Sequence, residues 1–272
     1  MANFASAQQL IDAHFSTWAP YWREVYDGDT VQSAIYRERL DLVLRWVDEL
    51  APTLGGESLD IGCGAGLFSV ALAKRGFRVR AIDTVEAMRT QTSRLALTEG
   101  VQEQVITEHG DAHHLRYTNA TFDLVLAIGV TPWLHSPEMA LKEVYRVLRP
   151  GGYLIITADN QIRLSHWLDP RFCPLHAAIR ARIGTFLRSV SLWHQSHVRM
   201  YSPLAFDRAL SVAGFSKVEG LTLGYGPFTF FDRQIIRDRI GIAIHKKLKN
   251  LATRNSLLRR VGSQYVVLAR KS

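Results

Sequence analysis

The sequence predicts an α/β fold in which a mostly parallel, doubly wound sheet is covered by helices. Short apolar segments alternate along the chain with segments of helical periodicity, as in a series of strand–helix–strand units. A glycine-rich turn between residues 62 and 66 joins the first strand of this pattern to the helix that follows it. The segment 122–130, FDLVLAIGV, is an apolar run bounded by polar residues, which is typical of a strand buried on both faces of a parallel sheet.

The composition is that of a globular protein without a membrane span. The chain has 272 residues, 47% of them hydrophobic, which suffices for one full α/β core and a small cap. No apolar run approaches the ~20 residues that a span needs, and the N-terminus lacks the features of a signal peptide. The two cysteines, Cys63 and Cys173, lie far apart, so we expect no disulfide framework and no metal site. These features predict an intracellular, cytoplasmic protein.

Residues 1–50 are expected to form a helical N-terminal segment. Aromatic residues gather before Asp27-Gly28-Asp29, at Phe15, Trp18, Tyr21, Trp22 and Tyr26. A long amphipathic helix is expected from about Val31 to Leu50, because apolar residues recur there at spacings of three and four. The aromatic residues allow two interpretations, a hydrophobic anchor on the core or a lid over a ligand. In the second interpretation Tyr26 and Arg37 are the candidate lid contacts.

The stretch 57–69, ESLDIGCGAGLFS, predicts a strand from Ser58 to Ile61 and a helix from Leu67 to about Arg75. The glycines at 62, 64 and 66 allow positive φ and a close approach to a ligand, and the helix N-terminus suits an anionic or richly polar group. The spacing D-x-G-x-G-x-G, which begins at Asp60, differs from the G-x-G-x-x-G of a dinucleotide site and argues against NAD. A tight turn without a ligand is the alternative.

LDIGCGAG resembles the first motif of class I S-adenosylmethionine-dependent methyltransferases, and VLRPGGYLIIT, at 147–157, resembles a second motif of that family. The resemblance covers about 55–160, with weaker support over 200–225. It is closest to the ubiquinone-biosynthesis-like and secondary-metabolite branch. It implies a Rossmann-like, mostly parallel seven-stranded sheet over a cofactor-binding core at 51–160. It also implies S-adenosyl-L-methionine as cofactor, with the glycine turn around its methionine part.

Acidic residues follow the second and third expected strands. Asp83 ends the strand Phe77–Asp83, where a carboxylate can accept both hydroxyls of a ribose, and an N-cap for the helix Thr84–Leu97 is the alternative role. Asp111 and Ala112 follow the strand Gln104–Glu108, where the family receives adenine. The resemblance therefore implies cofactor contacts at Asp60, Gly62, Cys63, Gly64, Gly66, Asp83, Thr84, Met88, Asp111 and Ala112, with Tyr26 and Arg37 added from the lid. His113 and His114 are expected to be polar surface residues.

The acceptor is expected at the carboxyl end of the fourth strand, Phe122–Val130, where open parallel sheets bind ligands. Trp133 is the candidate contact there. His135 is the candidate general base because the pKa of histidine lies near working pH, and a polar residue capping the helix Pro137–Leu148 is the alternative. The segment 161–200 is expected to be a cap insertion, from which His194 and His197 supply further candidate contacts.

The remaining residues, 201–272, are expected to complete the core. A helix from Pro203 to about Ala213 and the strands Lys217–Leu223 and Gln264–Ala269 flank a second insertion at about 228–261. Arginines and lysines interleave with isoleucines in that insertion. It can be a solvated face, a membrane-surface helix or an anion site, and the net charge of +8 does not choose among these.

The sequence therefore predicts transfer of a methyl group to a small-molecule acceptor, with a hydroxyl oxygen as the favoured acceptor atom and carbon or nitrogen left open. The alternatives are a lipid-linked or membrane-borne acceptor, a non-catalytic cofactor-binding module, and a dehydrogenase. Nucleic-acid amino-methyltransferases of this fold usually carry Asn or Asp before Pro-Pro and an aromatic residue after the fourth strand. Here that place reads VTPWL, so nucleic acid is not an expected substrate. The oligomeric state is left open.

Overall fold

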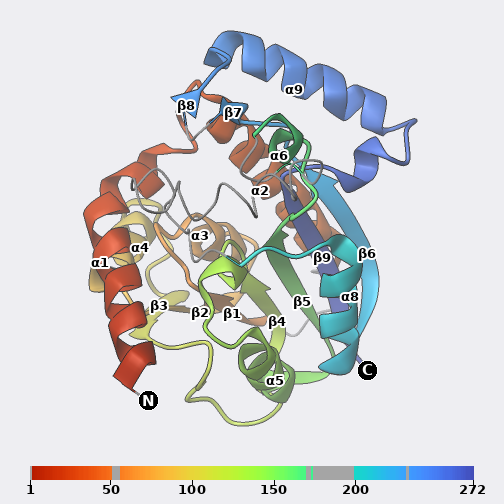
Figure 1. Ribbon diagram of the computed structural model, residues 1–272. Helices are drawn as coiled ribbons and strands as arrows, with labels where there is room; N and C mark the ends of the chain where they lie inside the picture. The colour runs from red at the N-terminus through yellow and green to blue at the C-terminus, as the bar shows by residue number, and fades with distance from the viewer. Residues whose placement is uncertain (1, 51–55, 170–172, 174–198, 231–232) are drawn as a thin grey trace.

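A seven-stranded sheet with the order β3-β2-β1-β4-β5-β9-β6 forms the centre of the protein (Figure 1). The computed structural model describes residues 2–50, 56–169, 173, 199–230 and 233–272. The strands are β1 (Glu57–Ile61), β2 (Arg78–Asp83), β3 (Val105–His109), β4 (Phe122–Ala127), β5 (Leu148–Asp159), β6 (Phe215–Leu223) and β9 (Gln264–Lys271). Strand β9 is antiparallel to β5 and β6, whereas the pairs among β1 to β5 are parallel. The predicted mostly parallel seven-stranded α/β sheet is confirmed.

Helices cover both faces of this sheet. Leu124 and Leu126 of β4 belong to the core formed with α2 (Val31–Leu50) and α3 (Leu67–Ala73). Val125 and Ala127 point to the other face, into the core formed with α5 (Pro137–Val147) and α8 (Pro203–Val212). Because successive side chains of a strand point to opposite faces, the apolar residues of β4 supply both cores.

The helix boundaries follow local signals in the sequence. The predicted helix from Val31 to Leu50 coincides with α2, and α1 (Ala2–Glu24) precedes it. Ser136 and Ser202 are the N-caps of α5 and α8, each is followed by proline, and each side chain accepts a hydrogen bond from a backbone N–H of the first turn. The helix α4 (Glu86–Thr98) begins two residues later than the predicted start at Thr84.

Among the strands whose lengths differ from their predictions, β4 and β5 affect the site. β4 ends at Ala127 instead of Val130, because the chain leaves the sheet at Gly129, which has a φ of 77°. β5 extends from Leu148 to Asp159, two residues past the end of the motif at 147–157, and its pairing with β4 is irregular between Leu148 and Tyr153. The lengthened end of β5 carries Asp159 beyond the end of β4, while it still pairs with Gln264 of β9.

Small elements follow the core strands. They are η2 (Thr131–Trp133), α6 (Ser165–Leu168), the hairpin β7 (Thr229–Phe230) and β8 (Arg233–Gln234), α9 (Asp238–Ala252) and η4 (Leu258–Arg260). Among the residues that the structure describes, no helix is both long enough and apolar enough to pass through a bilayer.

The strand order places a crevice at the carboxyl edge of the sheet. From β1 the chain proceeds to β2 and β3 on one side, and it then returns to β4 and β5 on the other side. The connections on the two sides of β1 therefore diverge at their carboxyl ends, which is where ligands bind in open α/β sheets.

Candidate functional site

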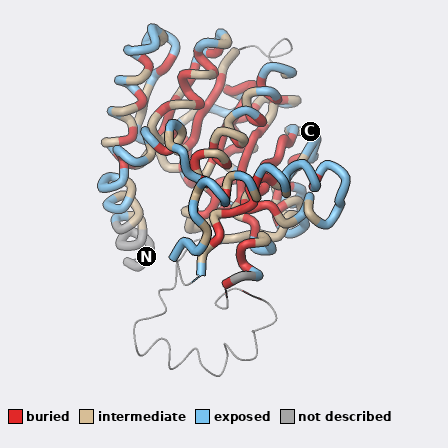
Figure 2. The backbone as a smooth tube through the Cα atoms, turned by 90° about the horizontal axis from the view of Figure 1, so that it is seen from above, coloured by how far each residue is buried: buried red, intermediate tan, exposed pale blue. Residues whose placement is uncertain are grey.

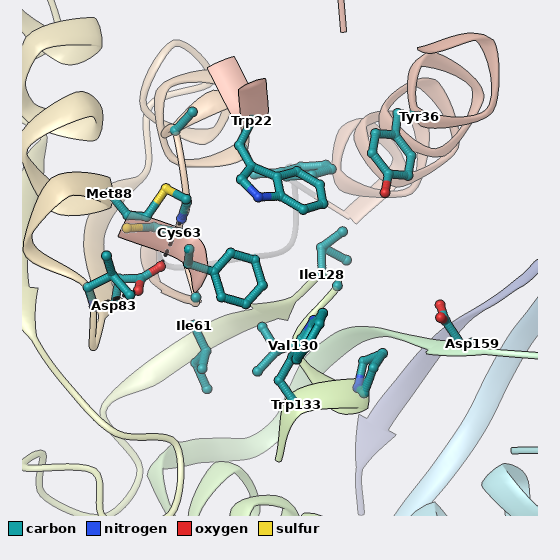
Figure 3. A pocket seen from close by; sticks show the side chains of 18 of the residues that line it. Trp22, Tyr36, Ile61, Cys63, Asp83, Met88, Ile128, Val130, Trp133 and Asp159 are labelled. Atoms are coloured by element: carbon teal, nitrogen blue, oxygen red, sulfur yellow. Dashed lines mark hydrogen bonds between the residues drawn. The ribbon is translucent and has the colours of Figure 1, made fainter. Parts of the chain in front are cut away.

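A cavity of about 370 Å³ lies between the carboxyl ends of the strands and the helices α1 and α2 (Figure 3). This volume is in the range of small-molecule and cofactor sites. In Figure 3, Asp83 and Met88 lie at one end of the cavity and Asp159 at the other, with Trp22, Ile128 and Val130 between them. The sequence-predicted residues that line it are Tyr26, Gly62, Cys63, Gly64, Asp83, Thr84, Met88, Asp111, Ala112 and Trp133.

The three glycines of the turn share positive φ but have different surroundings. Gly62, Gly64 and Gly66 have φ values of 65°, 54° and 88°. A Cβ on Gly66 would lie 2.8 Å from Cα of Thr92, so this glycine allows α4 to pack closely on the turn. A Cβ on Gly64 would meet no heavy atom nearer than 4.0 Å, and Gly64 lines the cavity. Gly64 is therefore the glycine that keeps the cavity free of a side chain.

Asp60 lies behind the turn instead of in the cavity lining. Its Oδ2 accepts a hydrogen bond of 2.6 Å from Oγ of Ser69, and the carboxyl group is buried. Burial, followed by repulsion from Asp83, raises the pKa of Asp60 to about 7, against the lowering effect of Ser69. The expected contact between Asp60 and a cofactor is thus not supported by its position, and the side chain links β1 to α3.

Asp83 connects the glycine turn to the start of α4. Its Oδ2 accepts from the backbone N–H of Gly64 at 3.1 Å, and its Oδ1 accepts from that of Val85 at 2.9 Å. The carboxylate therefore supports the first turn of α4 while it lines the cavity. Each oxygen has a second lone pair, so both can still accept from the hydroxyls of a ribose. Burial raises the pKa of Asp83.

The partly exposed Asp111 pairs with the buried His113 at the same end of the cavity. Oδ1 of Asp111 lies 2.9 Å from the backbone nitrogen of His113 and 2.6 Å from its Nδ1. Nε2 of His113 accepts from the backbone N–H of Ser136 at 3.2 Å, so the ring proton lies on Nδ1 and is donated to Asp111. These hydrogen bonds lower the pKa of Asp111. The prediction that His113 is a surface residue is wrong, because its partners from two loops bury it, whereas His114 is exposed.

His135, the candidate base, does not line the cavity in the described part of the chain. Its ring stacks on that of His113, with the centroids 3.5 Å apart, and its carbonyl accepts from Arg199 at 2.9 Å. Burial and the neighbouring His113 lower the pKa of His135, which favours its neutral form. The N-cap of α5 is Ser136, so His135 does not cap that helix either. His194 and His197 lie outside the described residues.

The aromatic residues of α1 reach the cavity as well as the core. Phe15 and Trp22 line the cavity, whereas Trp18 and Tyr21 are exposed. Phe15 meets Trp133 edge to face, with the centroids 5.0 Å apart, so α1 contacts the loop after β4. The anchor and lid interpretations of this segment are therefore compatible.

Arg39, and not Arg37, lines the cavity. Nη1 of Arg37 donates to the carbonyls of Tyr26 and Gly28, at 2.7 and 2.8 Å, and supports the connection between α1 and α2. Arg39 is buried, donates from Nη2 to the Tyr26 hydroxyl at 2.7 Å, and lies with its guanidinium carbon 4.3 Å from the ring centroid of Tyr36. Its Nε has no hydrogen-bond partner among the described residues. The lid contact expected from Arg37 thus corresponds better to Arg39.

The position of Arg39 could have been found from helix periodicity. Arg39 is four residues after Ile35 and four before Val43, both of which are buried on the apolar face of α2. An arginine in such a row must have a reason to be buried, such as an anionic or aromatic partner. An unpaired, buried N–H donor on a cation suits a carboxylate, such as that of the methionine part of a cofactor.

Asp159 and Arg163 were not singled out in the sequence. Both line the cavity, and Asp159 lies at the end away from Asp83 (Figure 3). Burial raises the pKa of Asp159, although Arg163 and Arg39 act to lower it. Oγ1 of Thr157 accepts from the backbone N–H of Gly129 at 2.7 Å, and Asp159 is on the same face of β5 two residues further along. Asp159 therefore lies beyond the end of β4, where an acceptor is expected.

The described residues contain no group of three or more His, Cys, Asp or Glu side chains that could hold a metal ion. The cavity has Asp83 at one end and Asp159 at the other, and the aromatic rings of Trp22 and Trp133 lie between them (Figure 3). Such a division suits a polar nucleoside at the first end and an organic acceptor at the second.

Comparisons with known proteins place this cavity in a family context. Residues 59–156 match the family model described as a methyltransferase domain. The chain is 32% identical over 122 residues to a ubiquinone biosynthesis O-methyltransferase of Pseudomonas putida (strain GB-1). These residues make up 44% of this chain and 51% of the relative. A protein of the same description from Psychrobacter arcticus is 26% identical over 176 residues, 64% of this chain and 65% of the relative. The chain spans about half the length of most of the curated relatives that it matches.

Solved structures share the fold at low sequence identity. Magnesium protoporphyrin IX methyltransferase (ChlM) from Synechocystis PCC 6803, with bound SAH, has a TM-score of 0.65 and 16% identity, over 98% of this chain and 100% of that one. The [4+2]-cyclase SpnF has a TM-score of 0.61 and 18% identity, over 96% of this chain and 94% of that one. At such identities the likeness shows the fold alone.

Proposed function

Since residues 59–156 form a methyltransferase domain of the class I S-adenosylmethionine-dependent type, we propose that this chain transfers a methyl group from S-adenosyl-L-methionine to a hydroxyl oxygen of a small organic acceptor. The observation that carries the proposal is the arrangement of Gly64, Asp83 and Asp111 around one end of a single cavity. The names of the curated relatives, O-methyltransferases, favour oxygen as the acceptor atom.

The residues of the cavity fit the proposed cofactor. Asp83 retains free lone pairs toward the cavity after its two backbone hydrogen bonds, which suits the two ribose hydroxyls. Asp111 and Ala112 line the place proposed for adenine. Gly64 leaves room for the methionine part, and the unpaired Nε of Arg39 suits its carboxylate.

The bound cofactor would supply an electrophilic methyl group, and the protein needs to orient the acceptor and remove its proton. Holding the reacting atoms near 3 Å and in line can lower the barrier by several kcal/mol. A general base adds about a hundredfold or more. The carboxylate of Asp159 is our candidate for this role, because it lines the acceptor end and burial makes it more basic than an ordinary aspartate. His135 would require rearrangement of its stack on His113.

The acceptor end suits a flat or lipophilic molecule. Tyr36 lies toward Asp159, and Trp22 and Trp133 present aromatic rings between the two ends of the cavity (Figure 3). Aromatic rings favour stacking or edge contacts with another ring and lose little entropy when they bind it. A phenol or catechol, free or attached to a lipid chain, therefore fits this end of the cavity.

The proposal needs a direct test because a protein of the same fold is named as a [4+2]-cyclase, and a fold alone does not define a reaction. The protein is incubated with S-adenosyl-L-methionine and a panel of phenols, catechols, amines and prenylated phenols, and products are analysed by mass spectrometry. We expect a gain of one methylene on a hydroxyl compound. Calorimetry with S-adenosylhomocysteine and with NAD provides the control. Binding of NAD alone, or methylation of amines alone, would contradict the proposal.

A further inference from the structure

The net positive charge of the chain comes from one segment. Residues 233–260 contain nine lysines and arginines and a single acidic residue, Asp238, so this segment carries +8, which equals the net charge of the whole chain. The other residues are balanced, with 24 basic and 24 acidic side chains. A field of one sign is thus concentrated on α9 and the residues that flank it.

The inner side of α9 is held firmly on α2. Gly241 lies against Val31, where a Cβ would come within 2.5 Å of the valine Cγ2, and Oδ1 of Asp238 accepts from the backbone N–H of Val31 at 2.9 Å. Glu38 of α2 pairs with Nε2 of His245 at 3.2 Å and with Nζ of Lys249 at 3.0 Å. These contacts determine which side of α9 faces outward.

The outward side of α9 carries a basic row beside an apolar row. Arg239, Lys246 and Lys247 are exposed, and they form no ion pair in the part of the chain that the structure describes. Ile240 and Leu251, eleven residues apart and so on one side of the helix, keep 57% and 48% of their surface exposed. Leu257, beyond the helix, is 72% exposed. Figure 2, which looks down on this side, shows α9 largely exposed.

This pattern differs from the other two possibilities for a basic helix. A helix face that only contacts water carries polar and charged residues, and not exposed isoleucine and leucine on the same side. A site for a small anion needs basic side chains that converge on one point, whereas Arg239 and Lys247 are eight residues, or about 12 Å, apart along the axis. An extended surface of negative charge over an apolar layer matches both rows.

We propose that α9 docks in the plane of an anionic lipid bilayer. Ile240 and Leu251 enter the boundary between headgroups and acyl chains, and Arg239, Lys246 and Lys247 contact lipid phosphates. The proposal concerns peripheral binding and is independent of the reaction assigned to the cavity.

Docking would bring the acceptor end of the cavity close to the lipid surface. The helix α2, on which α9 rests, contributes Gln32, Ile35 and Tyr36 to the cavity wall. Gly226 and Pro227, just before the basic segment, line the cavity as well. In Figure 1, α9 crosses the top of the molecule above α2, on the side where the strands end. An acceptor dissolved in the membrane would therefore have a short path to the cavity.

Sedimentation of the full chain with vesicles tests the proposal. Vesicles of phosphatidylcholine alone are compared with vesicles that also contain phosphatidylglycerol, without cofactor or acceptor. We expect binding to the anionic vesicles only, and weaker binding as salt is added. Replacing Arg239, Lys246 and Lys247 by glutamine should reduce the partition coefficient about a hundredfold, since each basic residue near the surface contributes roughly fivefold. The double variant Ile240→Ser and Leu251→Ser should also bind less.

A matched control removes the same charge elsewhere. Arg94, Lys142 and Arg208 are exposed on α4, α5 and α8, and their replacement by glutamine should leave vesicle binding within about twofold of the unmodified chain. Thermal unfolding and binding of S-adenosylhomocysteine check that each variant is folded. The proposal is overturned if the unmodified chain ignores anionic vesicles, if the control variant loses as much binding as the α9 variant, or if the serine variant binds fully. Binding of duplex DNA or RNA without binding of vesicles would assign the surface to nucleic acid instead. Failure of methyl transfer would not affect these results.

Discussion

Gly64 and Gly66 are two positions apart in one turn, yet an added methyl group meets different surroundings at each. At Gly66 a Cβ would lie 2.8 Å from Cα of Thr92, which is backbone and cannot easily move. At Gly64, which lines the cavity, the nearest heavy atom would be the carbonyl oxygen of Gly62, 4.0 Å away. The variants Gly66→Ala and Gly64→Ala therefore separate packing from ligand binding within a single turn.

The expected loss of stability differs between the two variants. Both residues have positive φ, 54° at Gly64 and 88° at Gly66, and alanine in this conformation costs about 1–2 kcal/mol. Gly66→Ala adds an overpacking cost of about 1–3 kcal/mol, for a total of roughly 2–5 kcal/mol. For a chain of this size each kcal/mol lowers Tm by about 2–4 °C, so Gly66→Ala should unfold several degrees below Gly64→Ala.

The expected loss of cofactor affinity has the opposite order. The methyl group of Gly64→Ala enters the cavity where the methionine part is proposed to lie, so the affinity for S-adenosylhomocysteine should fall at least about tenfold. Gly66→Ala, in the protein that remains folded, should bind within a few fold of the unmodified chain. Thermal unfolding and calorimetry at a temperature where both variants are folded provide the two measurements. If Gly64→Ala is the less stable variant, or if it binds normally, the assignment of the two glycines is wrong.

Three further predictions concern side chains of the site. Arg39→Gln should weaken binding of S-adenosylhomocysteine about tenfold to a hundredfold, which is the contribution of a charge-assisted hydrogen bond. Arg37→Gln should lower Tm and leave this affinity nearly unchanged. Calorimetry that shows the reverse order would reject Arg39 as the ligand. Asp159→Asn should lower the rate of methyl transfer about a hundredfold or more at unchanged affinity for S-adenosylhomocysteine. His135→Gln should lower this rate much less. A loss of affinity in Asp159→Asn would mean that the carboxylate holds the cofactor instead. Burial raises the pKa of Asp60 to about 7. Between about pH 4 and about pH 7 the folded protein therefore binds more protons than the unfolded chain. The contribution of Asp60 to the free energy of unfolding falls as pH rises through that window, by up to about 1.4 kcal/mol per pH unit. Urea unfolding at about pH 5 and about pH 8 should show a smaller difference in Asp60→Asn than in the unmodified chain, and an equal difference would show that Asp60 titrates normally.

The fold could be predicted because its signals are local. The helix α2 was placed from its apolar spacing, and the starts of α5 and α8 follow from Ser-Pro pairs. Asp83 was assigned to the cavity because a residue at the end of a strand beside the glycine turn has little freedom of position. The antiparallel orientation of β9 did not follow from the sequence, since an apolar strand has the same pattern in either direction.

The roles of individual site residues depended on neighbours that are distant in the sequence. His113 is buried because Asp111 and the N–H of Ser136 hold its two ring nitrogens, and no local pattern indicates that contact. Gly66 has the spacing of a ligand-binding glycine but serves the packing of α4. Asp159 became a candidate base only when β5 was found to extend past Thr157, whose hydroxyl lies beside Gly129.

The sequence by itself determined the class of this protein. A strand, a turn with glycines at alternate positions and an acid at the end of the next strand were enough to propose where the cofactor binds. Only the tertiary structure decided which arginine of α2 lines the cavity, which carboxylate lies at the end opposite Asp83 and which side of the basic helix faces outward. The physical reason is that backbone preferences and periodicity act over a few residues. The burial, charge and pairing of a side chain depend on the elements packed around it, and those come from every part of the chain.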